Sequence, residues 1–267
     1  MPEGHTLHRI ARRHRQALAG GPVRAWSPQG RFAADAAILD GRTLVNVEAH
    51  GKHLFYTWEG APRLHVHLGL VGKFRTHHAP GPDPTPGTRL VLGNDGTTAH
   101  LAGPMTCRLA DPSEVDLVLG SLGPDPIRSR RGRLAFLDGL ASRKRPIAGE
   151  LLDQRLIAGI GNVYRAELLF LAGIHPATPT SDLEPGEASR LWDLAVDELR
   201  VGVALGRIVT VRPVDLGASR RSQLSADERL YVYHRDGLPC RRCGTEILMS
   251  EIGGRRTWWC PSCQDRP

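Results

Sequence analysis

Residues 240–263, CRRCGTEILMSEIGGRRTWWCPSC, contain four of the five cysteines of the chain as two Cys-x-x-Cys pairs. Sixteen residues separate Cys243 from Cys260, a spacing that lets four thiolates surround one metal ion tetrahedrally. Either pair alone would also suit a thiol redox centre, but the two together favour zinc. Four ligands, Cys240, Cys243, Cys260 and Cys263, leave no position for water, so we predict one structural Zn²⁺ per chain.

The segment between the two cysteine pairs has the pattern of a β-hairpin. Residues 246–249 and 256–259 are rich in strand-forming side chains, and Gly253-Gly254 supplies a turn between them. Arg255 then lies close to the tip of a rigid hairpin. Two interpretations are open for it: a contact to the phosphates of a nucleic acid, or a charge that is only solvated.

Residues 156–164, LIAGIGNVY, place two glycines directly before a predicted helix that Asn162 would cap. Such a helix start favours an anion such as phosphate, because its dipole is positive there and its N–H groups point outward. The same glycines would also suit a tight turn between two helices. A dinucleotide site is disfavoured, since no parallel βαβ pattern precedes Gly159 and Gly161.

The sequence on both sides of these glycines is helical. Its periodicity predicts four helices, at residues 131–140, 146–154, 162–172 and 185–205. The last is the strongest, with Leu191, Ala195 and Leu199 on one face and Gly206 near its end. Residues 120–126, GSLGPDP, are the best candidate for a linker ahead of these helices.

Ahead of the linker, one helix is followed by short strands. Residues 4–19 have the pattern of an amphipathic helix, in which His5, His8 and His14 are interpreted as partly exposed or core-edge residues. Strands are predicted at residues 43–47, 52–58, 64–68, 89–92 and 97–101, the last two joined by a hairpin turn. Many short strands with frequent turns indicate an antiparallel sandwich or barrel.

Together these patterns predict an α+β multidomain chain. An N-terminal antiparallel β-sandwich with a leading helix would occupy residues 1–120. A helical domain would follow at residues 121–228, and a four-cysteine zinc-finger β-hairpin at residues 229–267.

The composition points to a phosphate-rich partner. The 267 residues include 35 Lys and Arg against 28 Asp and Glu, for a net charge of +7 and a pI near 9.6. No run approaches the ~20 apolar residues of a membrane span, and the N-terminus lacks the layout of a secretory signal. We therefore expect a cytoplasmic protein with reduced thiols, in which the isolated Cys107 is a small buried hydrophobe.

The chain begins Met1-Pro2-Glu3-Gly4, and removal of Met1 would leave Pro2 as a free secondary amine beside a carboxylate. An α-amino group has an unperturbed pKa of about 8, against about 10.4 for lysine, so much of it is unprotonated near neutral pH. Such an amine can attack an electrophilic sugar carbon and form an iminium, as lysine amines do. Alone, these residues would also be an ordinary N-terminus.

Four motifs in a fixed order give the chain its resemblance to a known family: Pro2-Glu3-Gly4, residues 50–54 (HGKHL), residues 159–164 (GIGNVY) and residues 255–264 (RRTWWCPSCQ). Together they resemble the formamidopyrimidine-DNA glycosylase/endonuclease VIII family, in its endonuclease VIII-like branch. The resemblance spans essentially the whole chain. It implies a two-sheet β-sandwich with a leading helix, a helix–two-turns–helix domain and a zinc-finger hairpin.

The resemblance also implies a function, that of a bifunctional DNA glycosylase/AP lyase of base excision repair. The partner would be damaged DNA, double-stranded and also single-stranded, with the damaged nucleotide flipped out. Pro2 would attack the sugar C1′, Glu3 would protonate the ring oxygen and shuttle protons, and β,δ-elimination would cleave the strand. We expect a monomer that works in the cytoplasm at the nucleoid.

The DNA contacts of the family can be carried over by matching position. Lys52, at a β-turn of the sandwich, would contact the DNA backbone and assist catalysis. Gly161 and Asn162 would hold the phosphates beside the lesion, as would Arg255, which would also assist catalysis. Leu70 matches a position whose side chain fills the gap left by the flipped base, although an ordinary core leucine would give the same pattern.

Three departures separate the chain from the purine-directed branch of the family. That branch begins Pro-Glu-Leu-Pro-Glu where this chain has Thr6, and it carries a lysine where this chain has Ala148. Its Arg-x-Phe loop has no match near residues 100–126. We therefore predict oxidised pyrimidines as substrates. The alternatives are the same chemistry on oxidised purines and a non-catalytic, zinc-dependent DNA-binding protein.

Overall fold

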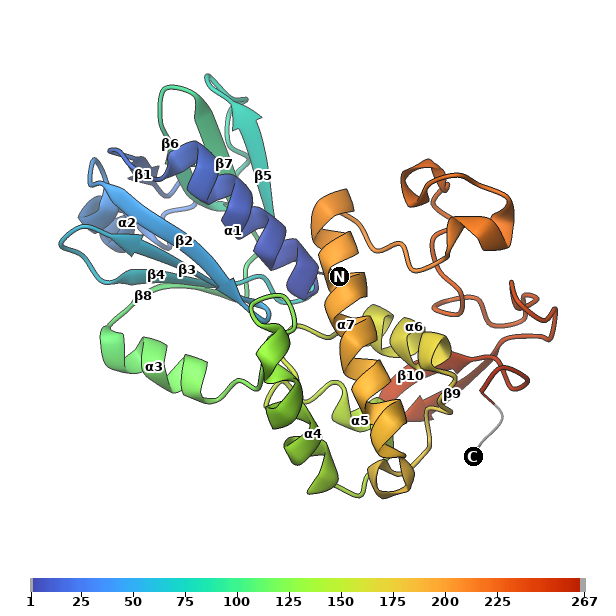
Figure 1. Cartoon of the computed structure of the whole chain (residues 1–267). Helices are drawn as coiled ribbons and strands as arrows, with labels where there is room; N and C mark the ends of the chain where they lie inside the picture. Colours follow the sequence, from blue (N-terminus) through green and yellow to red (C-terminus); the bar gives the residue numbers. More distant parts are fainter. Residues whose placement is uncertain (1, 265–267) are drawn as a thin grey trace. The chain divides into compact units, whose positions relative to one another are not determined.

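Two antiparallel sheets and a leading helix form residues 1–121, the first of two units into which the chain divides (Figure 1). The computed structural model describes residues 2–264 of the chain. In chain order, the elements of the first unit are α1 (Gly4–Leu18), β1 (Arg24–Trp26), α2 (Ala33–Leu39), β2 (Leu44–His50), β3 (His53–Trp58), β4 (Arg63–His67), β5 (Lys73–His78), β6 (Thr88–Gly93), β7 (Thr97–Ala102), β8 (Thr106–Ala110) and α3 (Pro112–Gly120).

The strands of this unit form a sandwich. They pair antiparallel in the orders β1-β6-β7-β5 and β2-β3-β4-β8. One buried core joins α1 to both sheets, with Leu7 from the helix, Leu54 from β3 and Leu101 from β7. The predicted N-terminal antiparallel β-sandwich with a leading helix is thus confirmed. The sequence patterns did not predict β1, β5, β8, α2 and α3.

The core of the first unit includes a histidine. His14 is 1% exposed, and its ring nitrogens form hydrogen bonds with the Tyr56 hydroxyl at 2.8 Å and the Thr76 hydroxyl at 3.1 Å. Burial lowers the pKa of His14 to about 4, so the ring is neutral. His5 is also buried. The expectation of core-edge histidines is therefore wrong for both, because the partners that satisfy His14 lie far away in sequence.

Residues 122–267 form the second unit, which is helical before the cysteine-rich hairpin. Its elements are the α-helices α4 (Arg133–Ala141), α5 (Ile147–Glu150), α6 (Asn162–Ala172) and α7 (Pro185–Leu205), four short 3₁₀ turns, and the strands β9 (Leu248–Ile252) and β10 (Arg255–Trp259). Helix α6 is buried at nine of its eleven positions and packs against α7 and β10. The bounds of α6 and α7 match the prediction.

Helix α5 is shorter than the predicted residues 146–154. It ends at Glu150, and three residues later the carboxylate of Asp153 accepts hydrogen bonds from the backbone N–H and the side chain of Arg155. A side chain that binds nearby backbone in this way competes with continued helix.

The β9–β10 hairpin turns at Gly253-Gly254, as predicted, with φ values of 60° and 72°. Two positive φ angles in a two-residue loop are the requirement of a type I′ turn, which glycine meets without strain. Strand β9 begins later than predicted because Ile247 instead donates its backbone N–H to Leu238 O at 2.9 Å. Over residues 2–264, no helix has both the length and the apolarity that a membrane crossing needs.

Candidate functional site

The N-terminal residues lie at a defined end of the sandwich. Helix α1 packs along β2, and just past the end of the helix Gly20 donates its N–H to Leu44 O, at the start of β2, at 2.8 Å. The helix therefore runs antiparallel to the strand. Fifteen helical residues span about 22 Å and seven strand residues about 23 Å, so the start of α1 lies level with the end of β2 (Figure 1). Pro2 and Glu3 directly precede that helix start.

Glu3 is the N-cap residue of α1 and is fully buried, whereas Pro2 is partly exposed. The Glu3 carboxylate makes no capping hydrogen bond to the first turn of α1. A carboxylate at this place is favoured in its charged form by the positive end of the helix dipole. The neighbouring His5 is neutral, since burial lowers its pKa to about 4.

Lys52 and Leu70 lie at the same end of the unit as Glu3. Lys52 follows Gly51, which has a φ of 56°, in the two-residue turn that joins β2 to β3. The pairing of His53 with His67 then places the end of β4, and the loop after it, beside this turn. Leu70 in that loop is 59% exposed, which excludes the alternative of a core leucine.

Two further apolar side chains that the sequence patterns missed are exposed near Leu70. Val71 is 79% exposed and Met105 is 70% exposed. The two loops touch at Gly69, where an added Cβ would lie 2.9 Å from the Cβ of Met105. In the sequence, the apolar Met105 in the Ala102–Thr106 turn could have indicated this exposure, because turns between strands are normally polar. The result is an exposed apolar cluster at the end of the unit that carries Pro2.

A column of rings lies directly below the Lys52 turn. The rings of Phe55, His65, His53 and His67 follow one another with centroid distances of 4.9, 5.2 and 4.7 Å. His53 Nδ1 and His65 Nε2 share a hydrogen bond of 2.9 Å. Burial lowers the pKa of His53 to about 3 and that of His65 to about 4, so the column is neutral beneath the Lys52 ammonium.

The glycine-rich stretch of the second unit forms a braced turn before α6. Gln154 accepts a hydrogen bond from Gly159 N at 2.9 Å and donates one to Ile160 O at 3.0 Å. Gly159 has a φ of 99°, a conformation that favours glycine. Gly161 is the N-cap residue, so the expectation that Asn162 caps the helix is wrong.

Asn162 instead joins the start of α6 to the finger hairpin. Its side-chain amide donates to Arg256 O at 3.1 Å, and the buried Arg165 of the same helix donates to the same carbonyl at 2.5 Å. Arg255, the preceding residue in the hairpin, is exposed. The structure thus brings together three predicted site residues, Gly161, Asn162 and Arg255, from parts of the chain more than 90 residues apart.

A buried carboxylate further along α6 anchors the chain that leads into the finger. Glu167 is fully buried and accepts hydrogen bonds from the backbone N–H groups of Tyr231, Val232 and Tyr233 at 2.8 to 2.9 Å. The hydroxyl of Thr210 also donates to it. A charged acceptor with several backbone donors is a strong arrangement, and it fixes where the finger begins.

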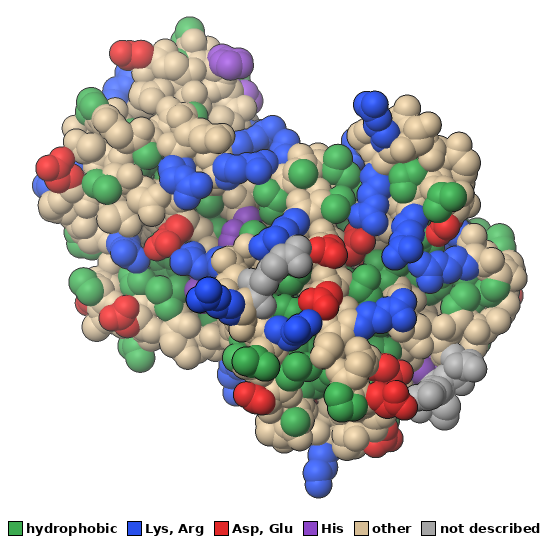
Figure 2. All heavy atoms as spheres, viewed as in Figure 1, with side chains coloured by type: hydrophobic (Ala, Val, Ile, Leu, Met, Phe, Trp, Pro, Cys, Tyr) green, Lys and Arg blue, Asp and Glu red, His purple; other side chains and the backbone are tan. Residues whose placement is uncertain are grey.

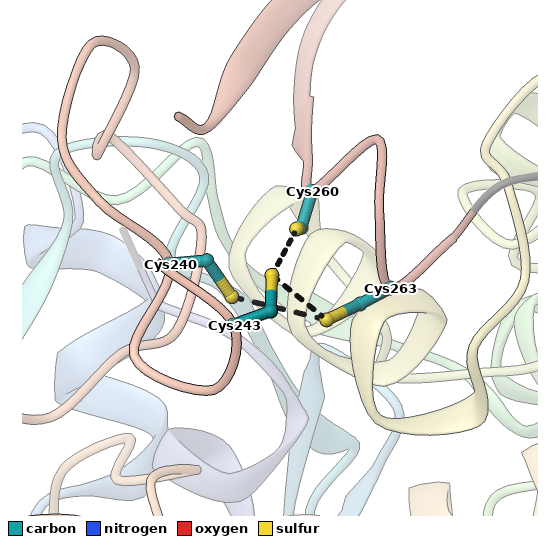
Figure 3. A group of neighbouring side chains, drawn as sticks. All are labelled: Cys240, Cys243, Cys260 and Cys263. Atoms are coloured by element: carbon teal, nitrogen blue, oxygen red, sulfur yellow. Dashed lines mark hydrogen bonds between the residues drawn. The ribbon is translucent and has the colours of Figure 1, made fainter. Parts of the chain in front are cut away.

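The four predicted metal ligands converge, as Figure 3 shows. The Sγ atom of Cys243 lies 3.4 Å from that of Cys260 and 3.5 Å from that of Cys263, and the Cys240 and Cys263 sulfurs lie 3.9 Å apart. All four sulfurs lie within 4.8 Å of one another. Tetrahedral Zn–S bonds of about 2.3 Å require sulfur–sulfur distances of about 3.8 Å, so the cluster fits one zinc ion.

The surroundings of the cysteines suit a structural metal. Hydrogen bonding to Thr245 lowers the pKa of Cys243 to about 6, whereas burial raises that of Cys260 to about 11. A zinc ion would offset the second effect, because it binds thiolates. Cys240 and Cys260 belong to the same buried apolar cluster as Phe170 of α6, so the metal site is part of a packed core. Cys107 is partly buried, and burial raises its pKa to about 12.

Three family models match successive parts of the chain. The formamidopyrimidine-DNA glycosylase N-terminal domain matches residues 1–112, the H2TH domain of the same glycosylase matches residues 122–212, and a zinc finger found in FPG and IleRS matches residues 237–266.

Curated relatives and solved structures agree with these models. The chain is 44% identical over 269 residues to endonuclease 8 1 of Mycobacterium tuberculosis, covering 99% of the chain and 100% of the relative. It is 34% identical over 282 residues to formamidopyrimidine-DNA glycosylase of Thermus thermophilus, covering 99% of the chain and 98% of the relative.

Among solved structures, a complex of Lactococcus lactis Fpg (MutM) with DNA containing N7-benzyl-Fapy-dG has a TM-score of 0.80 and 26% identity, covering 99% of this chain and 100% of that one. With both the fold and the sequence motifs in agreement, the chain belongs to the formamidopyrimidine-DNA glycosylase/endonuclease VIII family and is a DNA glycosylase/AP lyase with a structural zinc finger.

Proposed function

We propose that this enzyme removes oxidised pyrimidines from DNA and that Pro2 is its nucleophile. The Pro2 nitrogen attacks C1′ of the damaged nucleotide, the bond from C1′ to the base breaks, and the base leaves as an anion that takes a proton from water. Glu3 accepts the proton that the Pro2 nitrogen loses and passes it to the ring oxygen, so the bond from C1′ to that oxygen breaks and an iminium remains between Pro2 and C1′. The iminium makes the C2′ protons acidic, so the two phosphates leave in turn by β- and δ-elimination.

The observation that carries this proposal is the placement of Pro2 and the buried Glu3 at the end of the sandwich that also holds Lys52. A buried carboxylate on the residue next to the amine could carry a proton to or from it. The neutral histidine column leaves the Lys52 ammonium as the local positive charge, which suits a DNA phosphate. The exposed Leu70 is available to fill the space of a flipped nucleotide.

The second unit would supply the remaining phosphate contacts. Gly161 and Asn162 lie at the start of α6, where the helix dipole favours an anion, and Asn162 is bonded to the residue beside Arg255. The zinc ion holds the hairpin that carries Arg255 and takes no part in the chemistry. The substrate would be damaged DNA, double-stranded or single-stranded, bound by a monomer at the nucleoid.

Borohydride trapping on abasic-site DNA tests the assignment of the nucleophile. We expect a covalent adduct that proteolysis and mass analysis map to Pro2, because an iminium is reduced to a stable amine. The lysines Lys52, Lys73 and Lys144 are the other candidate amines, so an adduct on any of them would overturn the assignment. A form with a tag fused ahead of Pro2 should give no adduct, since an amide nitrogen cannot attack.

A further inference from the structure

Helix α1 and strand β5 lie side by side on the first unit. His14 of the helix bonds the Thr76 hydroxyl at 3.1 Å, and its ring meets that of Phe74 edge to face at 4.9 Å. Strand β5 is an edge strand, paired only with β7. Both elements begin at the end of the unit that carries Pro2, because β5 starts three residues after Leu70.

A groove of about 760 Å³ separates α1 from the end of β5 and the loop that follows it. Arg13 and Gln16 line it from the helix, and His77 and His78 line it from the strand. No carboxylate lines this groove. Its volume lies in the range of sites that hold one small molecule or nucleotide.

A second, smaller hollow of about 240 Å³ shares His77 and Pro82 with this groove. Lys73, Arg75 and His77 line the hollow from the strand, and the hydroxyl residue Thr85 lines it from the loop, with Asp83 as the only carboxylate. Within residues 2–264, no ion pair or hydrogen bond involves the side chains of Lys73, Arg75 or Asp83.

We propose that these two adjoining hollows, here together termed the α1–β5 groove, bind single-stranded DNA outside the catalytic site. Figure 2 shows Lys and Arg side chains gathered over these two elements. Arg13, Lys73 and Arg75 supply three fixed positive charges against one carboxylate, as phosphates require. The exposed imidazole ring of His78 offers a flat surface on which an unpaired base stacks, whereas the ring of His77 already packs against that of His100 at 5.1 Å.

The shape of the surface favours a single strand over a duplex. A groove closed by a helix on one side and a loop on the other admits an unpaired base, whereas the bases of a duplex are turned inward. Because both elements run away from the end that carries Pro2, a strand bound there would lie along a path that starts near the catalytic residues. This inference goes beyond the proposed lesion chemistry and does not depend on which base is excised.

The test uses the full-length protein with its lesion site already filled by a duplex that carries a tetrahydrofuran abasic analogue. A labelled, lesion-free oligothymidylate is then added and its binding measured by fluorescence anisotropy over a salt series. We expect a ternary complex. Each lost phosphate contact lowers the salt slope by about 0.7 for single strands, so the double variant Arg13→Ala/Arg75→Ala should lose about 1.4 from the slope.

The matched control is Arg24→Ala/Arg31→Ala, which removes the same charge from exposed positions. Arg24 lies on β1, at the opposite edge of the sheet that contains β5. This control should keep the slope of the parent. The proposal is overturned if the oligothymidylate fails to bind the filled protein or binds only by displacing the duplex, if both double variants lose the same slope, or if a lesion-free duplex of equal length binds the filled protein as tightly.

Discussion

At the scale of single residues, the buried His14 should make folding stability depend on pH. The unfolded chain binds a proton on this histidine near pH 6.5, but the folded chain does so only near pH 4. Between these values the unfolded state holds more protons, so the free energy of unfolding rises with pH. As pH falls from 6.5 to 4, this one residue should remove about 3 kcal/mol of stability.

Urea unfolding at several pH values between 4.5 and 7.5 checks this prediction. His14→Gln should flatten the dependence by up to about 1.4 kcal/mol per pH unit, since its side chain does not titrate. His8→Gln, a less buried position of the same helix, is the control. Equal pH dependence in His14→Gln and the parent would show that His14 does not stay neutral in the folded protein.

The buried Glu167 leads to a second prediction at this scale. Glu167→Ala should lower the free energy of unfolding by about 3 kcal/mol or more, because three backbone N–H groups would lose their acceptor. Asp138→Ala, which removes an exposed carboxylate from α4, should change it by no more than about 0.5 kcal/mol. Equal effects of the two variants in denaturant unfolding would contradict the anchoring role of Glu167.

At the scale of elements, the finger hairpin should depend on its metal. Cys243→Ser should lower the zinc content measured by atomic absorption and weaken DNA binding, because the hairpin that holds Arg255 would lose its order. Cys107→Ser is the matched control, being the same substitution at the one cysteine outside the cluster. Full zinc occupancy in Cys243→Ser would show that the Cys243 thiolate is not a zinc ligand.

Arg255→Ala tests the hairpin tip separately from the metal. The variant should keep its zinc and its fold, since the side chain is exposed. Its affinity for lesion-containing duplex should fall, with a salt slope about 0.9 shallower, as the loss of one phosphate contact on duplex DNA requires. Arg24→Ala serves as the charge control. If the variant binds lesion-containing duplex with the affinity of the parent across the salt series, Arg255 is only a solvated charge.

The elements show where sequence patterns are sufficient. Helices α6 and α7 were predicted with correct bounds because each ends at a glycine in the left-handed conformation, Gly173 at 76° and Gly206 at 74°. Strand β5 was missed because most of its side chains are exposed on both faces, which leaves no alternation to detect. Glu167 was missed as an anchor because its backbone partners lie 64 to 66 residues away.

At the scale of the whole molecule, the metal site was predictable because zinc chemistry fixes residue type and spacing, and the four cysteines do converge. The roles of Pro2 and Glu3 remain predictions from the sequence motif. The apolar cluster of Leu70, Val71 and Met105 was not, since it needs two loops from different strand pairs to meet. The link between Asn162 and the hairpin likewise depends on packing of α6 against β10, which periodicity does not report.

The substrate preference is a property of the whole enzyme. We expect faster excision of 5-hydroxycytosine, thymine glycol or dihydrouracil than of 8-oxoguanine opposite cytosine. Ring-saturated bases stack poorly and cost less to flip than an intact pair, for which unstacking takes a few kcal/mol. The departures at Thr6 and Ala148 remove residues of the purine-directed branch.

Single-turnover excision on matched duplexes measures this preference, with lyase activity on an abasic duplex as the common reference. Discrimination by the opposite base should be weak, and bubble substrates should be accepted. Faster release of 8-oxoguanine than of every pyrimidine lesion would overturn the preference and leave the Pro2 mechanism intact.

The hydrogen bond from Gly69 N to His67 Nδ1, at 3.2 Å, ties the loop that carries Leu70 to the end of the histidine column at the Lys52 turn. An accepting Nδ1 has no hydrogen, so the neutral ring must be the Nε2–H tautomer. Burial lowers the pKa of His67, which keeps the ring in this form at neutral pH. The ¹⁵N chemical shifts of this one imidazole should therefore report, in solution, whether the Leu70 loop stays in place when DNA arrives.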